Sequence, residues 1–325
     1  MTERAYFPSR RHALGLIGAT LLCPRTGWAQ GLDGISGAAF GTGWRLVGPP
    51  VVDLMNIQPD IEALFATIDR QMSPWRPDST VSQFNAAPAG SQAAEAEIIH
   101  VAHHALTLAN QSGGAFDPTV GPLVAQWGFG PIEGGATPNW RGLSAGNGRI
   151  GKTQGDLTFD LCGIAKGRAL DLAVDLAAQA NLGNLLFDLG GELKALGHHP
   201  SGRDWQIAVQ HPLPDHAPTA MIRLPTGRAV ATSGQRTQSY ELGGRVYGHI
   251  IDPAARSPAD TGLLTVTVLA DEAMMADGWA TALFAAGATD GPAQASDHAI
   301  DALFLVRDGA SFRQIRTGAI KGILL

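Results

Sequence analysis

The grouping of strand-like runs is the feature that most constrains this fold, because the runs do not alternate one by one with helical segments. Short stretches that are β-branched or alternate apolar with polar residues, most of them bounded by glycine or proline, are typical of strands. They lie at residues 184–187, 205–210, 220–224, 245–251, 263–270 and 302–307. Grouped strands favour an α+β fold and argue against a doubly wound parallel sheet.

Four segments have the spacing or flanking residues of helices. Phe65, Ile68 and Met72 follow one helical face, and Pro59 suits the first turn of that helix. Further helices are predicted over residues 95–109, 165–180 and 274–286. The 41 glycines and 20 prolines between these elements indicate many tight turns.

Length and charge limit the function classes. A chain of 325 residues can bury a substantial core, as one large domain or as two that are intimately joined. The net charge of −6 and the lack of a basic run argue against nucleic acid as a partner.

Residues 1–29 have the layout of an export signal. Arg10 and Arg11 precede an apolar run at 13–23, which is too short to cross a bilayer as a helix, and small residues at 27–29 suit a cleavage site. The arginine pair resembles a twin-arginine signal, which predicts a periplasmic protein exported after folding. Acylation at Cys23, which would anchor the chain to the inner membrane, is an alternative that the bulky residue before it disfavours. Once this segment is removed, Cys162 is the one remaining cysteine, so no internal disulfide forms, and its apolar neighbours predict a buried packing role.

Two glycine-rich segments could place ionisable groups close to a ligand. In residues 112–123, Asp117 precedes Pro118 and is expected to be exposed and conformationally fixed, although Asp-Pro is also a common turn. In residues 160–168, a strand gives way to a helix whose N-terminal amides suit phosphate, with Lys166 in the first turn. The alternative is an ordinary solvated lysine.

Two further segments carry a histidine and a carboxylate–hydroxyl pair. His249 lies on a predicted strand and could act as a general base, although a lone strand histidine is more often structural. Asp277 and Thr281 are four residues apart and share a helical face, so their oxygens could serve Mg²⁺. Taken alone, each feature also fits an ordinary structural role.

Taken together and in order, these segments resemble the FAD:protein FMN transferases of the ApbE family. The matching stretches are residues 75–79, 84–85, 114–123, 127–130, 160–167, 188–192, 231–234, 249–253 and 276–283. The resemblance spans roughly residues 41–287, and we place the corresponding domain at 35–320. It implies mixed sheets flanked by helices in two closely packed subdomains. Residues 137–149 have no clear match.

The resemblance also implies roles for particular residues. Mg²⁺ is expected on Asp277, Thr281 and the carbonyl of Gly163, while His249 and Lys166 are expected to be catalytic. Expected contacts to FAD are Phe40, where many members carry methionine, Trp75, Ala115, Phe116, Asp117, Asp160, Lys166, His249, Ile250 and Ile251.

The implied reaction is Mg²⁺-dependent transfer of FMN from FAD, through a phosphoester bond, to a threonine or serine of an acceptor flavoprotein, with release of AMP. The acceptor suggested by the family is a subunit of a membrane redox complex. Two alternatives stay open on the residues alone: an FAD pyrophosphatase that gives FMN and AMP, and a non-enzymatic periplasmic FAD-binding protein.

Overall fold

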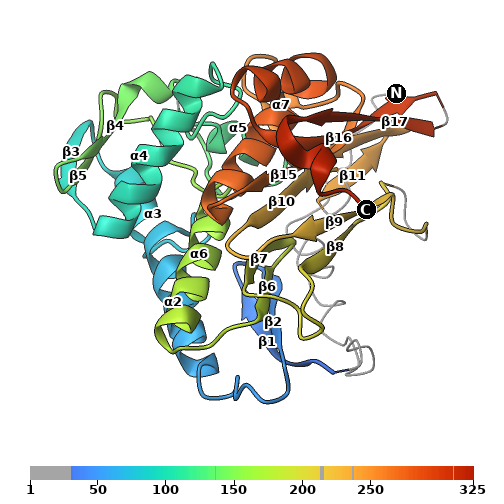
Figure 1. Cartoon of the computed structure of the whole chain (residues 1–325). Coiled ribbons are helices and arrows are strands. Elements are labelled where there is room, and N and C mark those ends of the chain that lie inside the picture. The colour runs from blue at the N-terminus through green and yellow to red at the C-terminus, as the bar shows by residue number, and fades with distance from the viewer. Residues whose placement is uncertain (1–30, 136, 213–215, 236–237, 310) are drawn as a thin grey trace, which may run out of the picture.

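The computed structural model describes residues 31–135, 137–212, 216–235, 238–309 and 311–325 (Figure 1). The predicted export signal at 1–29 lies outside these residues. Within them, no helix combines the length and apolar character needed to span a membrane.

An eight-stranded sheet with the order β1-β2-β6-β7-β10-β15-β16-β17 runs through the centre of the molecule (Figure 1). Its strands are β1 (Asp33–Ala39), β2 (Thr42–Gly48), β6 (Leu185–Leu189), β7 (Glu192–Leu196), β10 (Ala229–Gly234), β15 (Leu263–Ala270), β16 (Asp301–Asp308) and β17 (Ser311–Thr317). Every neighbouring pair is antiparallel. The predicted α+β class is therefore confirmed.

Helices α2 (Gln58–Met72), α6 (Ala165–Gln179) and α7 (Ala273–Asp297) cover one face of this sheet (Figure 1). In α2, the predicted apolar stripe is buried, and the ring of Phe65 packs against Trp44 of β2 at 6.0 Å. Each sheet strand presents alternate side chains to opposite faces, so a second core can form behind the sheet.

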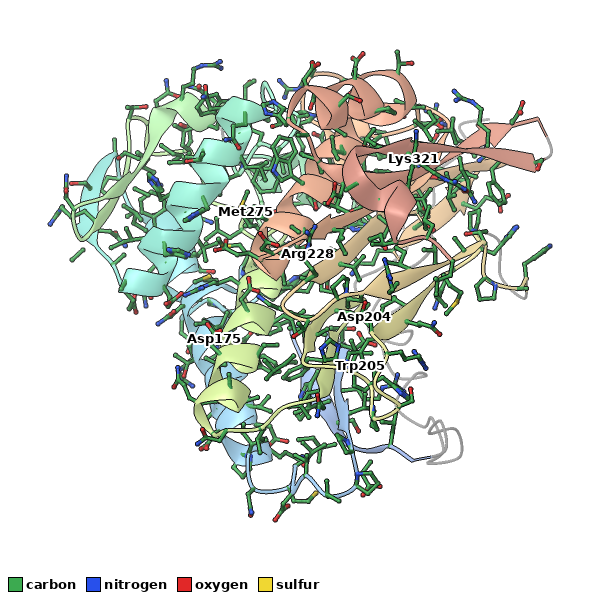
Figure 2. The ribbon with its side chains drawn as sticks, viewed as in Figure 1. Asp175, Asp204, Trp205, Arg228, Met275 and Lys321 are labelled. Carbon is green, nitrogen blue, oxygen red and sulfur yellow. The ribbon has the colours of Figure 1, made fainter. Side chains whose placement is uncertain are left out.

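The second core lies between the sheet and a two-stranded layer, β8 (Trp205–Val209) and β9 (Ala220–Leu224). In β16, Leu303 and Leu305 face this layer, whereas Phe304 faces the helices. Trp205, labelled in Figure 2 at the start of β8, is buried in this second core.

A smaller subdomain packs beside α2 and α7. It consists of α3 (Thr80–Ala86), α4 (Ala96–Gln111) and a sheet of order β3-β5-β4, namely β3 (Gly90–Ala93), β5 (Arg149–Lys152) and β4 (Leu143–Gly146). Buried residues of α4 and β5 join the main hydrophobic core without a break. The two parts are therefore closely packed.

The remaining elements are short and include one departure from the predicted strands. They are α5 (Gly121–Gln126), η1 (Trp140–Gly142), β11 (Ser239–Leu242), β12 (Arg245–Gly248), β13 (Ile251–Asp252), β14 (Ser257–Pro258) and η2 (Gly318–Gly322). The single strand predicted over 245–251 is wrong, because regular pairing stops after β12 and resumes at β13. His249 and Ile250 lie in this gap.

The N-terminal turns of α6 and α7 meet backbone to backbone (Figure 2, where Asp175 marks α6 and Met275 marks α7). A Cβ added at Gly167 would collide with the backbone of Ala273 and Met274, so only glycine allows this approach. The side chain of Asp171 on α6 accepts hydrogen bonds from the amides of Ala273 and Met274, at 2.8 and 2.9 Å. A carboxylate from another helix thus caps α7, whose local cap residue makes no such bond.

Candidate active site

Three charged side chains gather where α6, α7 and β7 meet. Nζ of Lys166, in the first turn of α6, lies 2.6 Å from Oε1 of Glu192, the first residue of β7. Asp277 lies in the second turn of α7, and its Oδ2 accepts a hydrogen bond of 3.0 Å from the amide of Gly167. Both carboxylates are buried. The structure therefore brings together Lys166 and Asp277, two of the predicted site residues, and adds Glu192.

Burial shifts the pKa values of all three charged groups in this cluster. Burial would lower the pKa of Lys166, but the nearby carboxylates of Asp277 and Glu192 outweigh that effect and raise it. Burial raises the pKa of Glu192 to about 7, against the opposing effect of Lys166. Burial also raises the pKa of Asp277. Two carboxylates share one ammonium, so a bound cation would relieve the unfavourable negative charge.

The oxygens around Asp277 fit a small divalent cation. Thr281, one turn further along α7, places Oγ1 3.5 Å from the carbonyl oxygen of Gly163. A Cβ at Gly163 would come within 3.1 Å of the Thr281 methyl group and 3.2 Å of the Phe116 ring, so glycine keeps this space open. One carboxylate plus neutral oxygens is a donor set that suits Mg²⁺, whose shell water and phosphate complete.

No group of three or more His, Cys, Asp or Glu side chains in the described part of the chain is placed to hold a metal ion. The carboxylate, hydroxyl and carbonyl of the Asp277 site therefore form a different kind of candidate from a His- or Cys-rich centre.

The turn after α4 is held by hydrogen bonds, and its residues 116–119 are buried. Oδ1 of Asp117 accepts hydrogen bonds from the amide of Thr119 at 2.8 Å and from its hydroxyl at 2.6 Å. The same hydroxyl accepts from the amide of Asn139 at 2.7 Å, so the segment just before η1 supports this turn. The prediction that Asp117 is exposed is wrong; burial raises the pKa of its carboxyl, although the Thr119 bonds oppose that rise. Phe116 of this turn lies beside Gly163.

Asp160 connects this turn to the start of α6. Its amide donates to the carbonyl of Pro118 at 2.7 Å, and its Oδ1 accepts from the amide of Cys162 at 3.0 Å. Cys162 is exposed, so the predicted buried packing role is wrong. The protein atoms around the thiol, together with Asp160, nevertheless raise its pKa well above the usual range, which disfavours a reactive thiolate.

His249 stands in the gap between β12 and β13. Its Nδ1 lies 3.2 Å from the carbonyl oxygen of Gln238, which can only accept, so Nδ1 carries the proton and Nε2 keeps its lone pair. Burial lowers the pKa of His249, and the charge of Lys166 lowers it further. At neutral pH the imidazole of His249 is therefore mainly uncharged, and the charge of Lys166 acts on it.

The other predicted FAD contacts occupy different surroundings. Ile250 and Ile251 are buried beside His249. Phe40 adopts a left-handed backbone (φ 52°) in the turn between β1 and β2 and packs against Phe65 at 5.5 Å. Trp75 follows α2 and is 65% exposed. Ala115 lies in the turn after α4. Contact with FAD stays a prediction for all of the residues named for it.

Sequence reasoning missed three residues of this site. Glu192 lies in the matching stretch 188–192 and had no predicted role, although a carboxylate directly after Gly190-Gly191 was an available signal. The roles of Asp171 and Asn139 depend on contacts between segments far apart in the chain, and no local pattern indicated them.

A half-buried lysine, hard oxygens that suit a cation and a histidine with a lowered pKa together form a site that suits phosphate chemistry. The sequence profile of the ApbE family matches residues 40–304. The chain belongs to the ApbE family.

Relatives and solved structures agree with this membership. The chain is 32% identical to the FAD:protein FMN transferase of Vibrio cholerae, over 89% of this chain and 92% of the relative. It is 29% identical to the enzyme of the same name from Klebsiella pneumoniae, over 86% and 85% respectively. The structure of the flavin transferase ApbE from Vibrio cholerae superposes with a TM-score of 0.81 at 30% identity, covering 90% of this chain and 99% of that one. The apo flavinyl transferase ApbE from Pseudomonas stutzeri gives 0.80 at 31% identity, covering 90% and 96%. The prediction of a transferase enzyme is confirmed.

Proposed function

We propose that this protein transfers FMN from FAD to a threonine or serine hydroxyl of an acceptor flavoprotein and releases AMP. The observation that carries the proposal is the cluster in which Lys166, Asp277, Thr281 and the carbonyl of Gly163 converge, with a neutral histidine in its field. The full-length match to enzymes named FAD:protein FMN transferase supports FAD as the substrate.

The chain's own residues account for the proton and the charge. The acceptor hydroxyl oxygen forms a bond to the phosphorus of the FMN half, and the bond from that phosphorus to the bridging oxygen breaks, so AMP leaves with that oxygen. Nε2 of His249 takes the hydroxyl proton, because Nδ1 is already protonated and bonded to Gln238. The ammonium of Lys166 stabilises negative charge on the phosphate oxygens.

Mg²⁺ fits the oxygens of Asp277, Thr281 and Gly163, where it would offset charge on the diphosphate. Asp277 is already oriented by the amide of Gly167, so its carboxylate needs little rearrangement to serve as a ligand. Lys166 on α6 and a metal ion held by Asp277 on α7 would then both offset negative charge on the diphosphate of FAD. The two helices meet at Gly167.

The test combines the purified chain, FAD, Mg²⁺ and a candidate acceptor, and follows covalent flavin fluorescence on a denaturing gel. We expect an acceptor labelled only when Mg²⁺ is present, and no labelling by D277A, which should still fold because Asp277 is one residue of a long helix. FMN and AMP without labelling would identify a pyrophosphatase. FAD that stays bound and intact would identify a carrier, and full transfer by D277A would remove the metal site from the proposal.

We also propose that the chain works in the periplasm on a subunit of a membrane redox complex. The arginine pair at 10 and 11 with its apolar run supports export by the twin-arginine route. Cell fractionation of a strain carrying R10K and R11K together tests this, because a twin-arginine substrate should then accumulate in the cytoplasm. Unchanged periplasmic delivery would contradict the proposed route.

A further inference from the structure

Glu192 holds Lys166 without belonging to any of the predicted sets of ligands. Its Oε1 is 2.6 Å from the Lys166 ammonium, and its Oε2 is buried without a hydrogen-bond partner. The Glu192 side chain is 6% exposed, whereas that of Lys166 is 29% exposed. The lysine is therefore the more accessible partner of this pair, and the glutamate is the more deeply buried one.

The backbone fixes the position of this carboxylate. Glu192 pairs with Leu189 across a tight turn of Gly190 and Gly191, both with positive φ. The amide of Gly191 donates to Oδ1 of Asp188 at 3.0 Å, and the amide of Gly190 donates to the carbonyl of Gly43 on β2. The carboxylate is thus anchored to the central sheet, while its lysine partner lies on a helix.

Without Glu192, the nearest counter-charge for the ammonium of Lys166 is Asp277. Both carboxylates already act on the pKa of Lys166. A lysine side chain is a compact charge on a flexible stem, so it would turn toward the carboxylate that remains. An ammonium bonded to Asp277 would compete with a metal ion for the same oxygens.

We propose that Glu192 is a positioning residue that holds the Lys166 ammonium away from Asp277, which leaves that carboxylate free for the metal and directs the lysine to the substrate's phosphates. The inference rests on the proposed function and concerns the same site. It assigns Glu192 no contact with substrate or metal.

The test is a double-mutant cycle read out by equilibrium binding as well as rate. The variants are E192A, E192Q, K166M and K166M/E192A, with thermal unfolding of each to verify the fold. FAD binding is measured by flavin fluorescence anisotropy across a Mg²⁺ titration, and transfer supplies kcat and KM separately.

For E192A we expect the half-saturating Mg²⁺ concentration to rise about tenfold, a common size for loss of an outer partner of a metal site. E192Q keeps an acceptor oxygen at the same distance and should recover most of that loss. In the K166M background, E192A should cause no further shift, because the competing ammonium is gone.

E97Q is the matched control. Glu97 on α4 pairs with Arg168 of the same α6 turn at 2.8 Å, so it tests loss of an ion pair on this helix away from the Lys166 cluster. It should leave the Mg²⁺ titration unchanged.

Three outcomes overturn the inference: no shift in E192A, an equal shift in the K166M background, or an equal shift in E97Q. Each presumes a wild-type protein that binds FAD and labels an acceptor. If the wild type does neither, the proposed function itself has failed.

Discussion

At the scale of single residues, the protonation of His249 has a direct kinetic consequence. Only the neutral imidazole can take a proton, and burial lowers the pKa of His249 below its ordinary 6.5, with the Gln238 carbonyl opposing that shift. The transfer rate should therefore stay constant through neutral pH and fall as the pH drops through the lowered pKa of His249. The midpoint of this fall at acid pH, the acid limb of the profile, should lie below 6.5.

A profile of kcat/KM between pH 4.5 and 8 checks this expectation. Circular dichroism over the same pH range verifies that the protein stays folded. H249Q should be slower by roughly 10²–10⁴-fold and should lack the acid limb. If that limb persists unchanged in H249Q, another group titrates.

Gly163 offers a second prediction at this scale, because a methyl group there would enter the space between Thr281 and Phe116. Its backbone is compatible with alanine, so the effect should be steric and local. We expect G163A to need about tenfold more Mg²⁺ for half-maximal transfer.

G183A is the control, since a Cβ at Gly183 meets no atom within 4 Å. A Mg²⁺ titration of both variants decides the matter. If G163A and G183A need the same Mg²⁺ concentration for half-maximal transfer, Gly163 does not shape the cation site.

At the scale of elements, Asp171 links three parts of the structure. Besides capping α7, its Oδ1 lies 2.6 Å from Nζ of Lys194 on β7. D171A removes the cap, worth about 0.5–2 kcal/mol, and leaves a largely buried lysine without its partner, a loss of up to about 3–5 kcal/mol. Urea unfolding should therefore show a fall of several kcal/mol in the free energy of unfolding.

D175A, an exposed change one turn along α6, should stay within about 0.5 kcal/mol of wild type. A D171A protein as stable as D175A would show that another group caps α7.

An element could be predicted from the sequence where its own residues carry the pattern of a helix, a strand or a break. The helix predicted over 274–286 stops where α7 kinks, at Gly287 with φ 86°, because glycine is a local signal. The half of α7 beyond the kink was missed, since Pro292 inside it argues against a helix. Strand β10 was also missed, because its small and hydroxyl side chains lack a strong strand pattern and pairing with β7 and β15 decides its structure.

At the scale of the whole molecule, the site draws on segments that are far apart in the sequence. Phe116, Gly163 and His249 lie in three connecting segments, whereas Glu192 begins β7 and Asp277 lies on α7. A ligand that bridges them can bind only when the fold is intact, so it must stabilise the fold as a whole.

FAD at 100 times its Kd should raise the free energy of unfolding by about 2.7 kcal/mol. Melting curves with FAD, with FAD plus Mg²⁺ and with FAD plus a chelator measure the effect. The increment due to Mg²⁺ should vanish in D277A. A melting temperature that does not change when FAD is added at saturating concentration would contradict FAD as the substrate.

The candidate site was predictable to the extent that its residues lie in short motifs. Asp277 and Thr281 share a helical face by spacing alone, and the helix that begins beside Lys166 was predicted from its local sequence. The strand predicted directly before that helix is wrong, because residues 153–164 form turns and irregular backbone. The convergence of Lys166 and Asp277 depends on how α6 crosses α7, which no periodicity encodes. The turn that buries Asp117 is likewise supported from a distance, because the amide of Asn139 donates to Thr119, twenty residues earlier in the chain.

The contact at Gly167 has a consequence for anyone who wishes to redesign this enzyme. The backbone of α6 contacts the backbone of α7 there, so no change of side-chain rotamer can widen the distance between the turn of Lys166 and the turn of Asp277. The spacing is a property of the path of the polypeptide. Accommodating a larger ion would require a shifted helix, and side-chain substitution alone would not achieve it.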